Sequence, residues 1–374
     1  MKKINAFQLY CMLLVMIMPV NFLIIPKVLT SYLGNNAWLA IITSLVPGTL
    51  IIYIYYSIIK KSLQPFPLLL EEHLGRIPGK TLGFIYVFFF ILTSSFTLRI
   101  FVEFIESNVL PGTPISIFIG VMLITAFTGI KSGLVSMARM AELITYVGVP
   151  FTFLMMALTL THNPDFGNLK PFAYMSYKAF ADALAFATMP LLNMLPVLTL
   201  FHYFQRENSF KPMFQVLLSY IVLVGLITIS TVVALGGQNS SLFTFPAFVA
   251  IRLVSIGDFI QNIDIVFIGI WIMGIFGVLS IWWFMACYTI QQVFNLHDYR
   301  FLAAPTALII GVTSILLSPN ILELNLLAKG VLPAVYYFFL LFIPLVVFVI
   351  TLFKAPVQHQ PEYPGSENPV STAE

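Results

Sequence analysis

Residues 7–29 read FQLYCMLLVMIMPVNFLIIPKVL, an apolar run that contains Pro19, Asn21 and Pro26. About 20 apolar residues are enough for a helix to cross the hydrocarbon core of a bilayer. No small-residue cleavage site follows the basic residues Lys2 and Lys3, which argues against a cleaved signal peptide. The run therefore predicts a transmembrane helix that carries helix-breaking residues inside it.

The composition of the whole chain agrees with this prediction. The chain has 374 residues, of which 59% are hydrophobic and only 9% are charged, whereas a soluble domain has about 25% charged residues. Such a chain cannot cover a water-facing surface, which excludes a soluble globular enzyme and a disordered protein. A net charge of +3 without a basic stripe excludes nucleic-acid binding. We expect an all-α integral membrane protein rather than a barrel, because the apolar runs are long and do not alternate.

Ten apolar runs are candidate spans, and the other segments connect them. The spans are 7–29, 36–59, 82–107, 114–130, 143–161, 183–204, 213–235, 263–293, 301–318 and 331–353. Two mixed segments, 66–80 and 240–262, predict amphipathic helices that lie along the membrane. Residues 1–353 are expected to form one transmembrane domain, and the Pro-, Ser- and Glu-rich residues 354–374 a disordered cytoplasmic tail.

The basic residues predict that both termini are cytoplasmic. With ten spans and an inside N-terminus, twelve basic residues lie inside and five outside; only Arg99 falls within a span. Cytoplasmic loops carry an excess of Lys and Arg, so this asymmetry favours the orientation. The inside set is Lys2, Lys3, Lys60, Lys61, Arg76, Lys80, Lys131, Arg139, Arg206, Lys211, Arg300 and Lys354, and the outside set is Lys27, Lys170, Lys178, Arg252 and Lys329.

Helix breakers recur five spans apart. Span 1 contains Met18-Pro19-Val20-Asn21, and span 6 contains Met189-Pro190-Leu191-Leu192-Asn193, with Pro196 following. Matching interruptions in two halves indicate the binding site of a transporter fold built from inverted repeats. We therefore expect broken helices 1 and 6 and two inverted five-helix repeats, about 7–161 and 183–353. The alternative is two ordinary proline kinks, since proline is common in membrane helices.

The charged and sulfur-containing residues give fewer clues. Arg99 and Glu103 lie one helical turn apart in span 3 and are expected to form an ion pair, structural rather than gating. Cys11 and Cys287 lie in apolar runs and predict buried packing residues. No Cys or His spacing matches a metal site, and we expect no metal and no cofactor.

At this point the sequence resembles the spore germination permease family, the B subunits of nutrient germinant receptors, which is similar to the amino acid–polyamine–organocation transporters. The resemblance runs from about Ile4 to Lys354. Its matching stretches are Phe7-Gln8, Pro26, Leu29-Thr30, Trp38, Leu74-Gly75, Gly83, Arg99 with Glu103, Thr113-Pro114-Ile115, Gly133, Ala138-Arg139, Glu142, Asn168-Leu169-Lys170-Pro171, Pro246, and Asp264 with Trp271. The chain departs from the family at Pro19-Val20-Asn21 and at Asn193, where small residues or glycine are usual.

The resemblance implies a membrane subunit that binds a small nutrient, commonly an amino acid, and helps to start germination. It implies a pocket among spans 1, 3, 6 and 8, a larger A subunit and a lipoprotein C subunit as partners, and the spore inner membrane as location. The candidate ligand-binding residues are Pro19, Val20, Asn21, Phe89, Thr93, Leu192, Asn193, Gly274, Val278 and Trp282. Asn21 and Asn193 offer hydrogen-bond donors and acceptors beside backbone dipoles freed by the breaks, while the stripes on spans 3 and 8 could equally be packing faces.

Two other functions stay open at this stage. One is a secondary transporter of amino acids coupled to protons or sodium. The other is a structural membrane subunit that has lost ligand binding, which the unusual residues at the breaks allow. The lack of acidic residues near the middle of spans 1, 6 and 8 disfavours the coupled transporter. None of the three functions is an enzyme.

Overall fold

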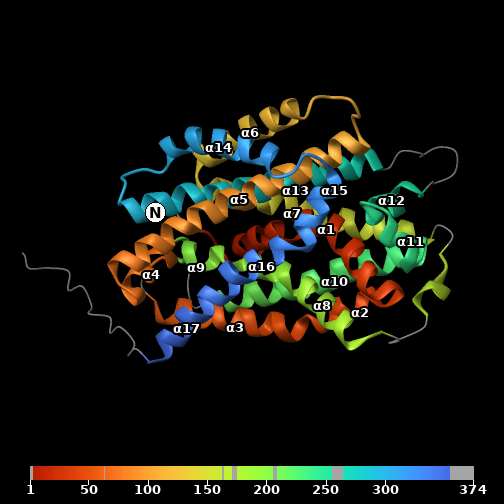
Figure 1. The fold of residues 1–374 in the computed structure, drawn as a ribbon, viewed down its shortest axis with the longest axis horizontal. Coiled ribbons are helices and arrows are strands. Elements are labelled where there is room, and N and C mark those ends of the chain that lie inside the picture. The colour runs from red at the N-terminus through yellow and green to blue at the C-terminus, as the bar shows by residue number, and fades with distance from the viewer. Residues whose placement is uncertain are drawn as a thin grey trace, which may run out of the picture.

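The computed structural model describes residues 3–62, 64–161, 164–170, 175–204, 209–254 and 264–353. The expected tail at 354–374, part of the amphipathic segment 240–262, and the basic residues Lys2, Arg206 and Lys354 lie outside these residues. Over the described ranges every regular element is helical, with no strand (Figure 1). The expected all-α class is confirmed.

The helices follow one another with short connections. In the first half they are α1 (Ala6–Leu33), η1 (Gly34–Asn36), α2 (Ala37–Thr43), α3 (Leu45–Lys61), α4 (Phe66–Leu74), α5 (Arg76–Asn108), α6 (Ile115–Ser132), α7 (Leu134–Thr161) and η2 (Phe166–Leu169). In the second half they are α8 (Tyr177–Thr188), η3 (Met189–Met194), α9 (Pro196–Leu200), η4 (Phe201–Tyr203), α10 (Phe210–Leu235), α11 (Gly237–Leu242), α12 (Pro246–Arg252), α13 (Asp264–Phe294), η6 (Arg300–Leu302), α14 (Ala303–Leu316), α15 (Ile321–Lys329), α16 (Val331–Tyr337), η7 (Phe338–Phe342) and α17 (Ile343–Phe353).

Many of these helices are long and apolar enough to cross a membrane. Among the described residues there are eight such helices, or nine when Arg300–Leu316 and Ile321–Lys329, bent by 101°, are taken as one broken span. One of the eight is the 56-residue run Ala6–Lys61, which turns back at Gly34, whose φ of +53° suits glycine. Figure 1 shows that α1 and α3, on either side of this turn, run in opposite directions. The chain is a multi-pass membrane protein; the ten-span inverted repeat stays a prediction.

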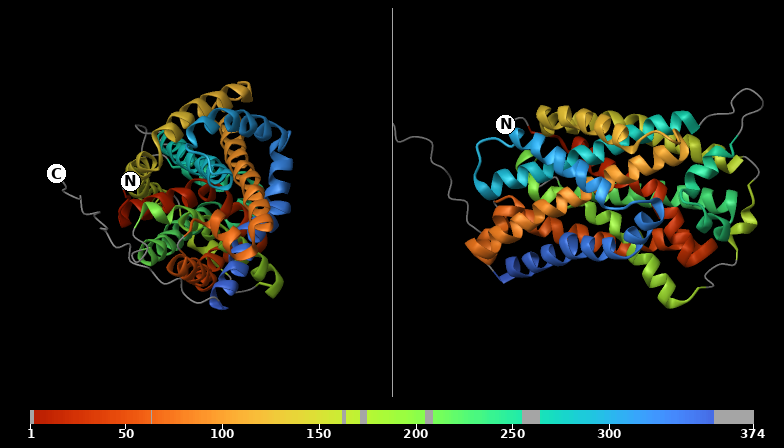
Figure 2. Two further views of the ribbon diagram at one scale, coloured as in Figure 1. Left: turned by 90° about the vertical axis from the view of Figure 1, so that its left-hand side faces the viewer. Right: turned by 45° about the horizontal axis from the view of Figure 1, so that its top comes forward.

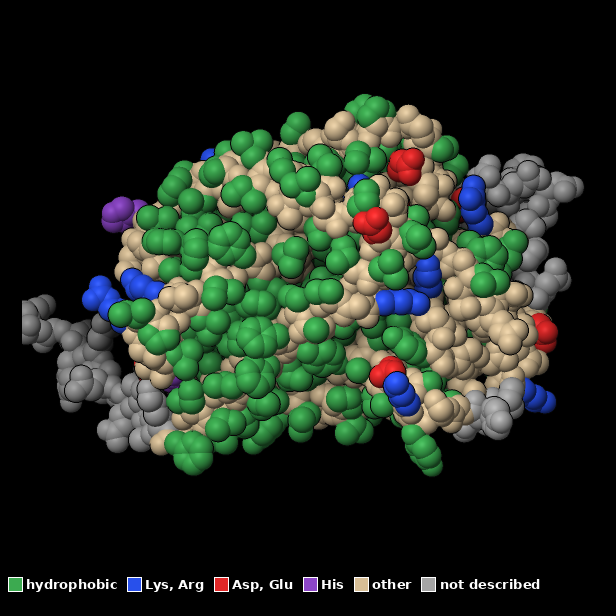
Figure 3. All heavy atoms as spheres, viewed as in Figure 1, with side chains coloured by type: hydrophobic (Ala, Val, Ile, Leu, Met, Phe, Trp, Pro, Cys, Tyr) green, Lys and Arg blue, Asp and Glu red, His purple; other side chains and the backbone are tan. Residues whose placement is uncertain are grey.

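The ends and the middle of the helical bundle differ in the side chains that they expose. The N-terminus and the end of α17 lie at the same end of the molecule (Figure 1), as an even number of crossings requires. Figure 3 shows hydrophobic side chains over the middle of one face, with charged side chains at its left edge and in its right-hand part. This distribution is that of a belt facing lipid between two wetter ends.

The spans differ in how deeply they are buried. Of the most apolar window of each span, 78% is buried in Ala6–Lys61, 83% in α5 and 89% in Tyr177–Tyr203, 67% in α10 and 56% in α13, against 22% in α6 and 28% in α7. The end-on view in Figure 2 shows α6 and α14 at one edge and α3 and α17 at the opposite edge, with α1, α5 and α13 between them. Residues from these inner spans therefore surround any internal site.

Candidate ligand-binding site

The break predicted in span 6 is confirmed. Helix α8 ends at Thr188, a 3-10 segment η3 follows over Met189–Met194, and α9 begins at Pro196. All six residues of η3 are buried. Pro190 and Pro196 have no N–H to give to a helix, so carbonyl groups of this segment need partners from elsewhere in the protein.

Tyrosine hydroxyls from other helices donate to carbonyls in and just before this segment. The Tyr220 hydroxyl donates to the Ala187 carbonyl at 2.6 Å, and the Tyr337 hydroxyl donates to the Ala185 carbonyl at 2.6 Å. The Tyr55 hydroxyl donates to the Leu192 carbonyl at 3.3 Å. The broken span is therefore tied through its backbone to α3, α10 and α16.

The same tyrosine of α3 also serves a second irregular segment. Span 10 contains a π-helical turn, η7, between α16 and α17. The Tyr55 hydroxyl contacts the Leu340 carbonyl of this turn, and the Tyr86 hydroxyl donates to the Phe339 carbonyl at 2.6 Å. The hydroxyl of Tyr55 thus links the two irregular segments η3 and η7.

Span 1 differs from its prediction. Helix α1 is continuous from Ala6 to Leu33 with Pro19 and Pro26 inside it, so the expected break in helix 1 is wrong. Pro19 has no N–H to donate to the Val15 carbonyl one turn earlier, yet the helix continues through it. The Trp271 indole Nε1 of α13 donates to the Pro19 carbonyl at 2.8 Å and so joins α13 to α1 beside this proline. The Asn21 side chain also donates to the Ile17 carbonyl at 2.6 Å. An uninterrupted α1 offers no half-helix N-terminus to a ligand carboxylate.

A small central cavity lies between α1, α5, η3, α13 and α16. Five of the predicted ligand-binding residues line it: Val20, Asn21, Asn193, Val278 and Trp282. The other lining residues are Met16, Ile24, Phe96, Thr97, Phe186, Met189, Ala328, Leu332 and Tyr336. The structure therefore brings together both predicted asparagines and residues from spans 1, 3, 6 and 8.

Asn193 is the most distinctive residue of the central cavity. Its side chain is buried, and its Oδ1 atom has no hydrogen-bond partner among the described residues. Leaving a buried polar atom unpaired costs about 1–3 kcal/mol, and a bound donor such as an ammonium group would remove that cost. Asn21 is likewise buried, with Nδ2 held by its own helix, and its amide oxygen remains an acceptor.

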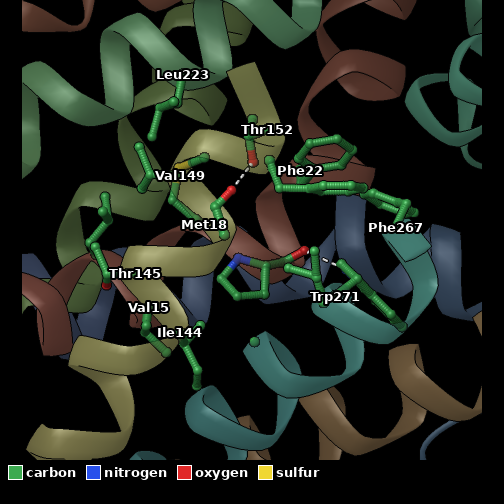
Figure 4. A pocket seen from close by; sticks show the side chains of 16 residues that line it. Val15, Met18, Phe22, Ile144, Thr145, Val149, Thr152, Leu223, Phe267 and Trp271 are labelled. Carbon is green, nitrogen blue, oxygen red and sulfur yellow. Dashed lines mark hydrogen bonds between the residues drawn. The ribbon is translucent and has the colours of Figure 1, made fainter. Parts of the chain in front are cut away.

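Pro19 and Gly274 do not line the central cavity. They lie in a second pocket between α1, α7, α10 and α13, whose side chains are apolar apart from Thr145 and Thr152 (Figure 4). A Cβ on Gly274 would meet the Pro19 ring at 2.7 Å. These two residues therefore allow α1 and α13 to approach closely.

Phe89, Thr93 and Leu192 also lie outside the lining of the central cavity. Phe89 is buried behind its wall, stacked on Phe339 with ring centroids 4.8 Å apart and edge-on to Trp282. The Thr93 hydroxyl donates to the Phe89 carbonyl at 2.9 Å, and Leu192 contributes only its carbonyl to Tyr55. For these three, the packing interpretation is the one that agrees with the structure.

The predicted ion pair of span 3 is present. Arg99 and Glu103 are 2.8 Å apart and both side chains are less than a tenth exposed. Neither lines the central cavity. The backbone of Ile321, at the start of α15, contacts the Glu103 carboxylate, so the pair joins α5 to the outer half of the bent span.

Sequence reasoning missed several residues of the central cavity. Phe186 and Met189 flank the break in span 6, and Leu332 and Tyr336 come from α16. The proximity of Met189 to Pro190 was a usable signal, and so was that of Leu332 to Pro333 in α16. Tyr336 has no adjacent proline or glycine and carried no such signal. Over the described residues, no group of three His, Cys, Asp or Glu is placed to hold a metal ion.

Comparison with known proteins finds relatives that are named as spore germination proteins. A family model described as spore germination protein matches residues 3–321. Spore germination protein KB of Bacillus subtilis is 22% identical over 94% of this chain and 95% of its own length. Spore germination protein XB of Bacillus anthracis is 27% identical over 74% of this chain and 78% of its own. The putative spore germination protein YfkT of Bacillus subtilis is 22% identical over 89% and 93%.

A solved structure shares the fold. It is Mhp1, a nucleobase-cation-symport-1 family transporter, in a closed conformation with bromovinylhydantoin bound. The TM-score is 0.62 at 15% identity, over 90% of this chain and 78% of that one. At this level of identity the similarity concerns the fold alone, and it agrees with the transporter-like architecture expected from the sequence.

Proposed function

Because the chain belongs to the spore germination protein family, we propose that it is the membrane subunit of a nutrient germinant receptor. In this proposal it binds a small nutrient, an amino acid, in the central cavity and thereby helps to trigger germination. The activity is binding and signalling rather than catalysis. The two asparagines orient the ligand, and the aromatic and aliphatic walls select its side chain.

The observation that carries this proposal is the unpartnered Asn193 oxygen in the central cavity. It lies on an irregular backbone segment buried in protein, and irregular backbone at membrane depth is tolerated where it is buried or lines a cavity. Asn21 from α1, Trp282 from α13 and Tyr336 from α16 line the same space. A ligand held there would contact four spans at once, so its binding would alter how they pack.

The proposed setting follows the family. We place the chain in the inner membrane of the spore, with both termini cytoplasmic, in a complex with a larger A subunit and a lipoprotein C subunit. Support comes from the relatives named as spore germination proteins and from the excess of basic residues at the end that holds the N-terminus.

A second candidate function is secondary transport of amino acids coupled to protons or sodium. The likeness in fold to a transporter favours it, although a fold does not determine function. The lining of the central cavity contains no acidic residue, and this favours the receptor over a proton-coupled transporter.

The decisive experiment is Asn193→Leu in an otherwise intact receptor. We expect the variant to accumulate in the membrane at normal levels and to lose the germination response to the nutrient that the unmodified receptor senses. Asn108→Leu is the matched control, because Asn108 bonds only within its own region of α5. A normal dose–response curve for Asn193→Leu would contradict the assignment of the central cavity.

A further inference from the structure

A second cavity lies next to the central cavity, toward the end opposite the termini. This vestibule is lined by Ile24, Lys27, Val28, Phe96, Ile100, Thr244, Phe245, Ile321, Leu324, Asn325, Ala328 and Lys329. It shares Ile24, Phe96 and Ala328 with the central cavity. The two spaces are therefore adjacent, and the vestibule lies beside the central cavity at that end.

Two lysines from different helices line the vestibule. Lys27 is half-buried on α1, six residues after Asn21, which is a rise of about 9 Å along the helix. Lys329 is exposed at the last residue of α15, and its charge lies close enough to act on Lys27. The Lys329 Nζ atom donates to the Ser31 hydroxyl at 3.1 Å. The vestibule is therefore positively charged on two sides.

These positive charges have no carboxylate partner in the part of the chain that the structure describes. The ion pairs found there are Arg99 with Glu103, Arg252 with Asp264, and Arg300 with Asp298. A lysine at the end of a span ordinarily extends into water, whereas Lys27 lines a cavity and faces a like charge. Two cations facing one enclosed space repel each other, and an anion between them would remove that repulsion.

We propose that the vestibule receives the carboxylate of the nutrient, with Lys27 and Lys329 as its binding groups. The ligand class is a small organic acid or zwitterionic amino acid, with its apolar part against Ile24 and Phe96. This inference rests on the proposed function. It gives the carboxylate a place, next to the central cavity, that the uninterrupted α1 does not.

The test uses the purified full-length protein in lipid nanodiscs. The probes are the twenty standard amino acids and their uncharged carboxamides, with binding followed by thermal stabilisation. We expect some amino acids to stabilise the unmodified protein far more than their carboxamides. In Lys27→Gln and Lys329→Gln the apparent Kd for those amino acids should rise about tenfold, while Lys27→Arg and Lys329→Arg should restore it. Lys178→Gln, an exposed lysine of α8 that lines neither cavity, should behave as unmodified protein.

The salt dependence of binding is a second measurement, and it should be absent if the two lysines have a purely structural role. Screening becomes effective over about 8 Å at 0.15 M salt, so added NaCl should weaken binding to the unmodified protein and leave the double Gln variant unchanged. Equal binding of acids and carboxamides, or unchanged Kd in both Gln variants, would overturn the vestibule assignment. The proposed function is tested separately, since it fails if deletion of the gene leaves every nutrient response of the spores intact.

Discussion

At the residue scale, two buried polar groups of α5 and η3 differ in their surroundings. The charges of Arg99 and Glu103 pair at 2.8 Å away from the central cavity, although Arg99 Nε has no partner within the described residues. The Asn193 oxygen also lacks a partner there, but it belongs to the lining of the central cavity. An ion pair whose charges balance each other suits a structural role, whereas an unpaired acceptor in the lining of a cavity suits ligand binding. The structure therefore places the ion pair of α5 apart from the cavity that Asn193 lines.

The ion pair of α5 should contribute to stability rather than to the nutrient response. Arg99→Met leaves the buried Glu103 carboxylate without its counter-charge, and we expect a loss of about 3–5 kcal/mol of unfolding free energy, the usual cost of breaking a buried pair. The measurement is SDS-induced unfolding in mixed micelles. The double variant Arg99→Met with Glu103→Gln removes the unpaired charge and should recover much of the loss.

Glu106→Gln is the control for this pair. Glu106 lies on the same helix and belongs to none of the ion pairs among the described residues. It should change the unfolding free energy by less than about 1 kcal/mol. If the double variant is as unstable as Arg99→Met, the loss comes from packing of the arginine stem and the charge argument fails.

At the element scale, tyrosine hydroxyls compensate for irregular helices. Tyr55→Phe removes the hydroxyl that donates to the Leu192 carbonyl of η3, which also accepts from the Leu195 N–H, and to the Leu340 carbonyl of η7. We expect a loss of about 1–3 kcal/mol and a weaker nutrient response, because η3 carries Asn193. Tyr53→Phe on the same helix is the matched control, since Tyr53 is 56% exposed and should have little effect. Equal stability of the two variants would show that the carbonyls of η3 and η7 do not depend on Tyr55.

The contact between α1 and α13 should be sensitive to a single methyl group. A Cβ on Gly274 would lie 2.7 Å from the Pro19 ring, closer than packed carbons approach. Gly274→Ala should therefore push the helices apart and cost about 1–3 kcal/mol by overpacking. Gly269→Ala on the same helix meets nothing within 4 Å, so it should be neutral in the same thermal unfolding assay. A neutral Gly274→Ala would mean that the two helices can move apart freely.

The sequence predicted these elements better than it predicted their irregularities. Hydropathy located the spans, and the prolines located the break of span 6 correctly. Proline alone could not distinguish a break from a proline tolerated inside a helix at Pro19, because neighbouring helices decide whether a membrane helix continues through a proline, and the local sequence does not contain them. Asn21 and Asn193 were identified as cavity residues for the same local reason, but Tyr55 and Tyr336 were not, since their roles arise only when distant helices pack.

At the scale of the whole molecule, the positions of the vestibule and the central cavity bear on the direction from which a nutrient would enter. The vestibule opens toward the end that holds Lys27 and Lys329, opposite the N-terminus and the end of α17. In the proposed binding mode, a nutrient that arrives from outside the membrane meets the lysines before it meets the asparagines. This sequence of contacts requires the orientation that the basic residues predict.

That orientation can be measured by cysteine labelling in whole cells of an expression host. Cys11 and Cys287 are both free and buried, and they are replaced by serine to give a background without cysteine. Lys60→Cys and Lys170→Cys then place single thiols at exposed positions on opposite sides of the predicted membrane. A membrane-impermeant maleimide should label position 170 in intact cells and position 60 only after permeabilisation, because the excess of Lys and Arg holds the end with Lys60 in the cytoplasm. Labelling of position 60 alone in intact cells would reverse the orientation, and the vestibule would then face the cytoplasm and could not receive a nutrient from outside.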